Sequence, residues 1–154
     1  MDRAPTDHDA DFYTWTQEQA DALRRAGESR VNVPIDWENV AEEIESLGSE
    51  QAFALESALM RIMEHMLKLQ YSPAQAPRAG WEVSVGKHRR EALRRLKRNP
   101  GLKGKLDELF ADAWKDGRGA AAESLRTYDG VGEEVLPVEC PWTVDEVLSQ
   151  RQED

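Results

Sequence analysis

Residues 40–69 read VAEEIESLGSEQAFALESALMRIMEHMLKL, and the spacing of apolar residues in this stretch decides the fold. From Ile44 to Leu69, apolar or small side chains recur in steps of three and four without a break in phase, which is typical of an α-helix. Gly48 and Ser49 can still divide the stretch, because Gly weakens a helix and Ser can begin a new one. The pattern therefore predicts one bent helix or two nearly collinear helices over residues 37–70.

The apolar surface of the same stretch widens beyond Phe53. Further apolar side chains lie outside the main stripe, namely Leu59, Met60, Met63, Met66 and Leu67. A helix that is apolar around most of its circumference is covered by other parts of the protein. We therefore expect this helix to be central, with its three methionines filling the core rather than forming an adaptable binding surface.

A shorter helix is predicted over residues 16–26. Thr16 and Gln19 have the spacing of a capping box, and Gly27 is a natural residue to end the helix. Three aromatic residues come before it, namely Phe12, Tyr13 and Trp15. We expect these aromatics to anchor the entering chain to the core.

The second half of the chain predicts three more helices. A loop through Pro73 and Pro77 precedes a helix over residues 79–98, and Asn99 with Pro100 begins another that extends to about residue 125. A capping-box spacing recurs at Thr143, which begins a short terminal helix. No strand-like alternation is present. We therefore predict an all-α fold, a small bundle of about four main helices with a short C-terminal helix, forming one domain over residues 1–154 with flexible tails at 1–10 and 150–154.

Composition narrows the class of protein. The chain has a net charge of −10, with 32% charged and 40% hydrophobic residues, which is typical of a folded globular protein. No apolar run is long enough to span a membrane, and the acidic N-terminus lacks the features of a signal peptide. The single cysteine, Cys140, cannot form an intramolecular disulfide. These features predict a cytoplasmic protein with a reduced thiol and no membrane association.

One basic segment interrupts the acidic chain. Residues 87–105 hold nine basic residues and one acidic residue. Helical periodicity places most of these cations opposite the apolar face of the helix predicted over residues 79–98, and they are the candidate partner-binding residues: Lys87, Arg90, Arg94, Lys97 and Arg98. They can pair with acidic residues of this chain, with a protein partner or a second copy, or with nucleic acid. The net charge disfavours nucleic acid, because an acidic protein repels phosphate.

Two histidines and a carboxylate are the weak candidates for a metal site. His65 and His88 both fall within apolar stripes of their helices, and Glu43 borders the apolar face that carries Val40 and Ile44, so they could supply two imidazoles and one carboxylate. The alternative is that both histidines are hydrogen-bonded core residues. Glu38, Glu42 and Glu45 form an acidic row opposite the apolar face of their helix, and we expect this row to be a solvated helix face rather than a metal site. Because no recognised metal-ligand spacing is present, we expect neither a metal nor a cofactor.

Several motifs in the chain resemble a known family. They are Asp11-Phe12-Tyr13 with Trp15, residues 36–48 (DWENVAEEIESLG), His65 with Leu67-Lys68, Gln70 and Tyr71, and Glu139-Cys140-Pro141-Trp142-Thr143. Together they resemble the bacterial family catalogued as a domain of unknown function, number twenty-nine. The resemblance implies a small helical protein and supplies no activity, cofactor or catalytic residue.

Three functions remain open at this stage. The composition and the helical pattern favour a small binding or interaction protein that is not an enzyme. The alternatives are a small metal-dependent enzyme that uses Glu43, His65 and His88, and a nucleic-acid-associated regulator that uses the basic helix.

Overall fold

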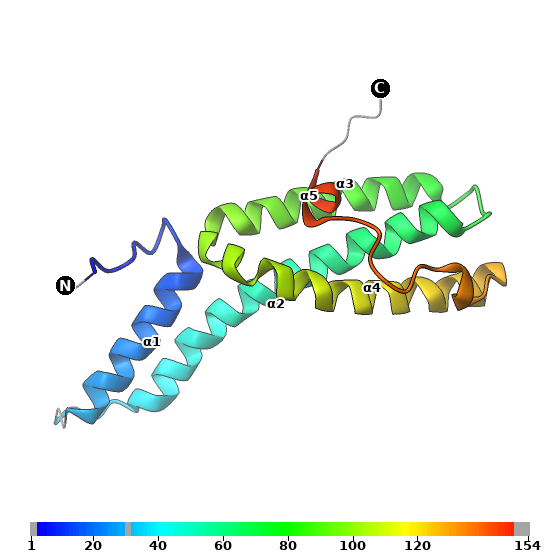
Figure 1. Cartoon of the computed structure of the whole chain (residues 1–154). Helices are drawn as coiled ribbons and strands as arrows, with labels where there is room; N and C mark the ends of the chain where they lie inside the picture. The colour runs from blue at the N-terminus through cyan, green and yellow to red at the C-terminus, as the bar shows by residue number, and fades with distance from the viewer. Residues whose placement is uncertain (1–2, 30–31, 150–154) are drawn as a thin grey trace. The chain divides into compact units, whose positions relative to one another are not determined.

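The computed structural model describes residues 3–29 and 32–149, and all of its regular elements are helical (Figure 1). The α-helices are α1 (Phe12–Glu28), α2 (Trp37–Tyr71), α3 (Arg78–Arg98), α4 (Leu106–Asp129) and α5 (Val144–Leu148), with two short 3₁₀ helices, η1 (Pro100–Lys105) and η2 (Glu133–Val135). Within the described residues there is no strand. The predicted all-α class, with four main helices and a short C-terminal one, is confirmed.

The chain folds as two compact units. The first contains the described residues up to Ala54 together with Arg95–Lys105, and the second contains Leu55–Arg94 and the described residues from Leu106 onward. The single domain expected over residues 1–154 stays a prediction, because α2 and α3 each contribute residues to both units. Of the expected tails, residues 1–2 and 150–154 lie outside the described residues, whereas Thr6 hydrogen-bonds to the Glu18 carboxylate.

The first unit is built on a close approach between α1 and α2. A Cβ atom added at Gly48 of α2 would lie 2.1 Å from the Thr16 hydroxyl of α1, so only glycine fits at this contact. Thr16 is fully buried and donates its hydroxyl hydrogen bond to the Tyr13 carbonyl at 2.6 Å. The α-helix α2 continues through Gly48 and Ser49 without interruption, which resolves the choice between one helix and two. The glycine serves packing here rather than chain termination.

An ion-pair cluster joins the same two helices. Arg24 of α1 contacts Glu38 at 3.2 Å and Glu45 at 2.7 Å, both on α2. The predicted acidic row is therefore partly neutralised across the helix pair. These contacts are partly exposed, so they add modestly to stability.

The start of α1 differs from the prediction. The helix begins at Phe12 rather than Thr16, because Asp11 accepts a hydrogen bond from the Thr14 backbone N–H and caps the first turn. The aromatic residues expected before the helix therefore belong to it, and it continues through Gly27 to Glu28. Asp11 and Thr16 both have the residue type of an N-cap, and the structure uses Asp11.

The start of α4 was also predicted wrongly. Asn99 and Pro100 begin the 3₁₀ helix η1, and α4 itself runs from Leu106 to Asp129, beyond the expected end near residue 125. Leu102 in η1 is fully buried in the first unit, where Gly101 also lies against Thr14 and Asp11. This apolar anchor and close approach accompany the tighter 3₁₀ turn.

The second unit packs α3 and α4 against the C-terminal part of α2. Its core side chains on α2 are fully or almost fully buried, and they are Leu55, Ala58, Leu59, Ile62, Met63 and Leu67. At Gly117 of α4, an added Cβ atom would lie 2.8 Å from the Met60 carbonyl oxygen, so α4 meets the backbone of α2. The expectation that this part of α2 is central is confirmed within the unit. Of the three methionines expected to fill the core, however, only Met63 is fully buried, whereas Met60 and Met66 are half-buried.

The C-terminal segment after α4 packs onto the same unit (Figure 1). Arg118 donates a 2.7 Å hydrogen bond to the Pro137 carbonyl, and the Trp114 indole N–H donates to the Val138 carbonyl at 3.2 Å. The short helix α5 then begins at Thr143, whose side chain and that of Glu146 form the predicted capping box. Buried Val147 fixes this helix to the core.

No helix in the described part of the chain is long and apolar enough to cross a membrane.

Candidate functional site

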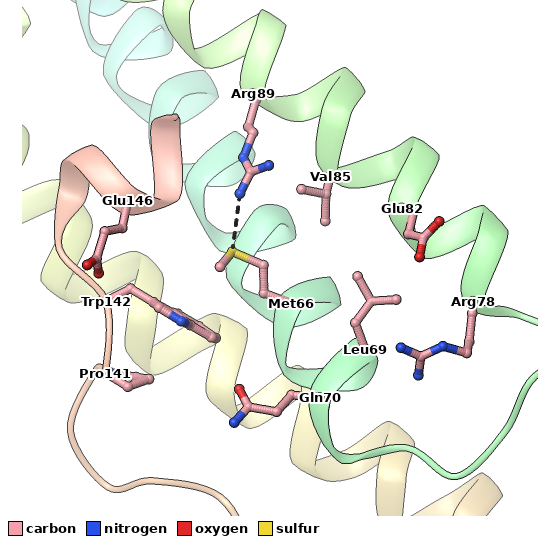
Figure 2. Close-up of a pocket in the computed structure, with 10 residues that line it drawn as sticks. All are labelled: Met66, Leu69, Gln70, Arg78, Glu82, Val85, Arg89, Pro141, Trp142 and Glu146. Carbon is pink, nitrogen blue, oxygen red and sulfur yellow. Dashed lines mark hydrogen bonds between the residues drawn. The ribbon is translucent and has the colours of Figure 1, made fainter. Parts of the chain in front are cut away.

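A groove of about 730 Å³ lies in the second unit, between α2, α3 and the C-terminal segment (Figure 2). Its α3 residues are Arg78, Glu82, Val85 and Arg89, which recur at the spacing of one helix face. The other side of the groove comes from the last turns of α2 and from the segment around α5. Residues far apart in the sequence therefore form one concave surface.

The centre of the groove is apolar. Met66 and Leu69 of α2 meet Val85 of α3, and the Trp142 ring closes the opposite side (Figure 2). Val85 is only 6% exposed, so it belongs to both the core and the groove. This surface can bury an apolar group.

Trp142 is held in place by its neighbours. Its ring packs edge-on against Trp114 of α4, with the ring centroids 6.1 Å apart. The capping box of α5 begins at the next residue, which fixes the backbone that carries the indole. This wall of the groove is thus formed by a packed aromatic side chain on an anchored segment.

Arg89 brings a positive charge to the groove. Its Nε donates a 2.8 Å hydrogen bond to the Val147 carbonyl, and its Nη2 lies 3.9 Å from the Met66 sulfur. Burial lowers the pKa of Arg89, and no carboxylate in the described part of the chain pairs with it. Because a guanidinium has five N–H donors, this one retains donors for a further acceptor.

Three other charged side chains line the groove, namely Arg78, Glu82 and Glu146. Arg78 and Glu82 lie one turn apart on α3, so opposite charges accompany each other at that end. Glu146 lines the groove near α5, but its carboxylate accepts the Thr143 backbone N–H at 3.0 Å. This neutral N–H does not cancel the charge of the carboxylate, so the two arginines and two glutamates that line the groove balance overall.

The three metal candidates are placed in different surroundings. Glu43 is exposed in the first unit, whereas His65 and His88 belong to the second. The His88 Nδ1 is 2.8 Å from the Ser84 carbonyl, which is a structural role. Across residues 3–29 and 32–149, no group of three or more His, Cys, Asp or Glu side chains is arranged to hold a metal ion.

His65 lies beside a buried charge cluster. Glu64 is only 5% exposed, and it contacts Arg61 at 3.1 Å and Lys68 at 3.7 Å. The His65 Nε2 is 3.7 Å from the Glu64 carboxylate, and its buried Nδ1 has no hydrogen-bond partner in the described structure. Burial lowers the pKa of His65, although Glu64 opposes this effect. The imidazole is therefore neutral near pH 7.

Cys140 is a protonated thiol. Burial raises its pKa, the nearby Glu146 carboxylate raises it further, and the hydrogen bond with the Trp142 backbone opposes both. The sulfur lies 3.4 Å from the Trp142 carbonyl and 3.9 Å from the Met63 sulfur. This environment disfavours a reactive thiolate.

The sequence-predicted cations on α3 are all exposed. Lys87, Arg90 and Arg94, named here the α3 cations, belong to the second unit, and Lys97 and Arg98 belong to the first. Arg98 lies 5.7 Å from the centre of the Phe12 ring. In the described chain none of the α3 cations has a carboxylate partner, so the expected pairing with acids of this chain is not found for these three.

Sequence reasoning missed the groove and its arginine. In the sequence, Arg89 is one of the nine basic residues of positions 87–105. Its position offers a signal, because it lies four residues after Val85 and three before Ala92, both of which are buried. An arginine at the edge of an apolar helix stripe indicates a side chain that lies along the core.

The fold and the groove define an all-α protein of two helical units with no recognisable catalytic constellation in its described residues. A family model described as "Domain of unknown function DUF29" matches residues 8–152. The chain belongs to this family, as its motifs predicted.

One solved structure is similar to the chain over most of its length. It is the crystal structure of an alpha-helical protein of unknown function from Rhodospirillum rubrum, with a TM-score of 0.77 and 26% sequence identity. The similarity covers 94% of this chain and 90% of the other. No curated protein matches the chain. These relatives support the helical fold and indicate no specific function.

Proposed function

We propose that this protein is a non-catalytic interaction protein whose α3 cations bind an acidic surface on a protein partner. The observation that carries the proposal is that Lys87, Arg90 and Arg94 are exposed and lack carboxylate partners in the described chain. They lie three and four residues apart, so they are neighbours along one face of α3. Like charges at this spacing repel each other, and an anionic partner relieves that repulsion.

The surroundings of the α3 cations favour a protein over nucleic acid. Val83 lies on the same face and is 70% exposed, and Leu93, three residues after Arg90, is 43% exposed. Apolar side chains next to arginines are typical of protein interfaces. The net charge of −10 opposes contact with an extended phosphate backbone.

The partner is therefore a protein with carboxylates near an apolar contact. A second copy of this acidic chain meets that description and is one outcome of the test. The cytoplasmic location and the lack of a metal or cofactor remain predictions from the sequence.

Fluorescence anisotropy with two labelled probes tests the proposal. The probes are an oligoglutamate peptide and a DNA duplex, each titrated with the parent protein and with the Arg90→Glu, Arg94→Glu double variant. We expect the peptide to bind the parent more tightly than DNA does, and the double variant to weaken peptide binding by about tenfold or more. The matched control is the Lys115→Glu, Arg126→Glu double variant, which reverses two exposed cations on α4 and leaves peptide binding unchanged.

The outcomes separate the possible partners. DNA that binds more tightly than the peptide, with loss in the double variant, would replace the proposal by a nucleic-acid function. Equal peptide binding by the parent and the double variant would reject a role for the α3 cations. Sedimentation that shows a dimer in the parent and a monomer in the double variant would identify the acidic partner as a second copy.

A further inference from the structure

We infer that the groove around Arg89 binds an organic monocarboxylate with an apolar body. This site is separate from the α3 cations, which do not line the groove. Its volume of about 730 Å³ lies within the range of small-molecule sites, roughly 300–1,000 Å³. Two features specify the ligand: a fixed guanidinium and an apolar centre. The lining holds two glutamates as well as two arginines, which disfavours a second negative charge on the ligand.

The guanidinium is oriented before any ligand arrives. The Val147 carbonyl accepts the Arg89 Nε hydrogen at 2.8 Å and thereby restricts the plane of the group. The Met66 sulfur near Nη2 is a weak acceptor at 3.9 Å, so it does not satisfy the terminal nitrogens. The remaining N–H donors can bind the two oxygens of a carboxylate as parallel hydrogen bonds.

The partly buried position strengthens this interaction. The Arg89 side chain is half-buried and has therefore lost part of its hydration, and this burial lowers its pKa. A carboxylate restores charge compensation at a place where the surrounding medium screens it less than bulk water does. Phosphate esters carry a second negative charge, which the Glu82 and Glu146 carboxylates of the lining would repel, so a monoanion fits better.

The apolar body of the ligand extends from Arg89 across the centre of the groove. Figure 2 shows the Arg89 guanidinium directed toward Met66, with Leu69 and the Trp142 ring further into the groove. An alkyl chain or an aromatic ring can pack on these three side chains. Each buried CH₂ group of a ligand contributes roughly 0.8 kcal/mol, so affinity should rise with chain length until the groove is filled.

The rest of the groove does not call for a second anion. Arg78 has Glu82 one turn away, and Gln70 offers an uncharged amide. Glu146 at the other rim accepts the neutral Thr143 backbone N–H, which does not cancel the charge of its carboxylate, so it repels a second anion. The ligand therefore has one carboxylate and no required second charge.

Nuclear magnetic resonance on the unaltered chain tests this inference. Octanoate is the probe, and its head-group controls are octylammonium and octan-1-ol, while acetate tests the need for an apolar body. We expect octanoate to shift the signals of the Trp142 indole N–H and the Arg89 Nε–H, with an affinity about tenfold or more above that of each control. Because no residue is changed, this comparison does not depend on the folding of a variant.

Variants then assign the binding to Arg89. Arg89→Gln should weaken octanoate binding by about tenfold or more, and Arg89→Lys should restore only part of it, because lysine lacks the fork of two parallel donors. Arg126→Gln, an exposed arginine on α4, is the matched control and should not change the affinity.

Three results would overturn the inference. The first is that octanoate leaves the Trp142 and Arg89 signals unmoved, the second is that octylammonium or octan-1-ol binds as tightly, and the third is that Arg89→Gln retains full affinity in a folded protein. None of these results bears on acidic peptide binding by the α3 cations, so the two proposals fail separately.

Discussion

The Arg89 guanidinium on α3 and the Val147 carbonyl on α5 are joined by a 2.8 Å hydrogen bond. This bond links the C-terminal segment to α3, while the same segment contacts α4 through Trp142 and Trp114. The segment is therefore a packed part of the second unit. One wall of the groove depends on this arrangement.

Replacement of Trp142 by alanine should destabilise the second unit. The loss of its packing on Trp114 should lower the free energy of unfolding by about 2 kcal/mol, less than for a fully buried tryptophan. The control is Val138→Ala, because this side chain in the same segment is 81% exposed and its loss should cost under about 0.5 kcal/mol. Urea unfolding measures both. Equal stabilities of the two variants would contradict the packing role.

The contact between α2 and α4 predicts opposite effects at two nearby glycines. Gly117→Ala places a Cβ atom 2.8 Å from the Met60 carbonyl oxygen, so the helices must separate, at a cost of about 1–3 kcal/mol. Gly119→Ala meets nothing within 4 Å and should gain up to about 1 kcal/mol, because alanine favours a helix. Thermal unfolding compares them. A stabilising Gly117→Ala substitution would show that α4 does not approach Met60 so closely.

The burial of His65 predicts a pH dependence of stability. Its pKa is lowered from the usual 6.5 by burial, against the opposing effect of Glu64, while Lys68, His88 and Arg61 lower it further. The unfolded chain therefore binds the proton more tightly than the folded chain. The contribution of neutral His65 is complete above pH 6.5 and is lost as the pH falls from there through the folded pKa.

Urea unfolding at about pH 7.5 and at successively lower pH checks this dependence. His65→Gln should lose less stability than the parent over the same range, because the titrating group is absent. Glu56 acts in the opposite sense, since burial and nearby Asp112 raise its pKa, but both proteins share this effect. Identical pH profiles for the two proteins would show that His65 does not couple to folding.

Local sequence signals predicted much of the fold. Apolar periodicity identified the helices, and the spacing of Thr143 and Glu146 identified the cap of α5. The signals failed where two local solutions compete. At the first helix, Asp11 and Thr16 are both possible N-caps, and Asp11 is the one that begins α1. After Asn99, an α-helix was expected, but the chain forms the 3₁₀ helix η1 around buried Leu102.

The candidate site was harder to predict because it depends on tertiary contacts. The exposed α3 cations follow from the helical period alone, since charged residues opposite an apolar stripe face water. The groove instead requires Met66, Arg89 and Trp142 to meet, and no local pattern encodes the distance between them. The two metal-candidate histidines showed the same limit, because a stripe position does not define a hydrogen-bond partner.

Amide signal mapping with the oligoglutamate peptide tests the central claim most directly. On a ¹H–¹⁵N spectrum of the whole chain, the account predicts that the largest peptide-induced shifts fall on the α3 face that carries Val83, Lys87, Arg90 and Arg94, and that they diminish as salt rises. Shifts concentrated on α4 or α1 instead, or no shifts at low salt, would contradict the assignment of partner binding to the α3 cations.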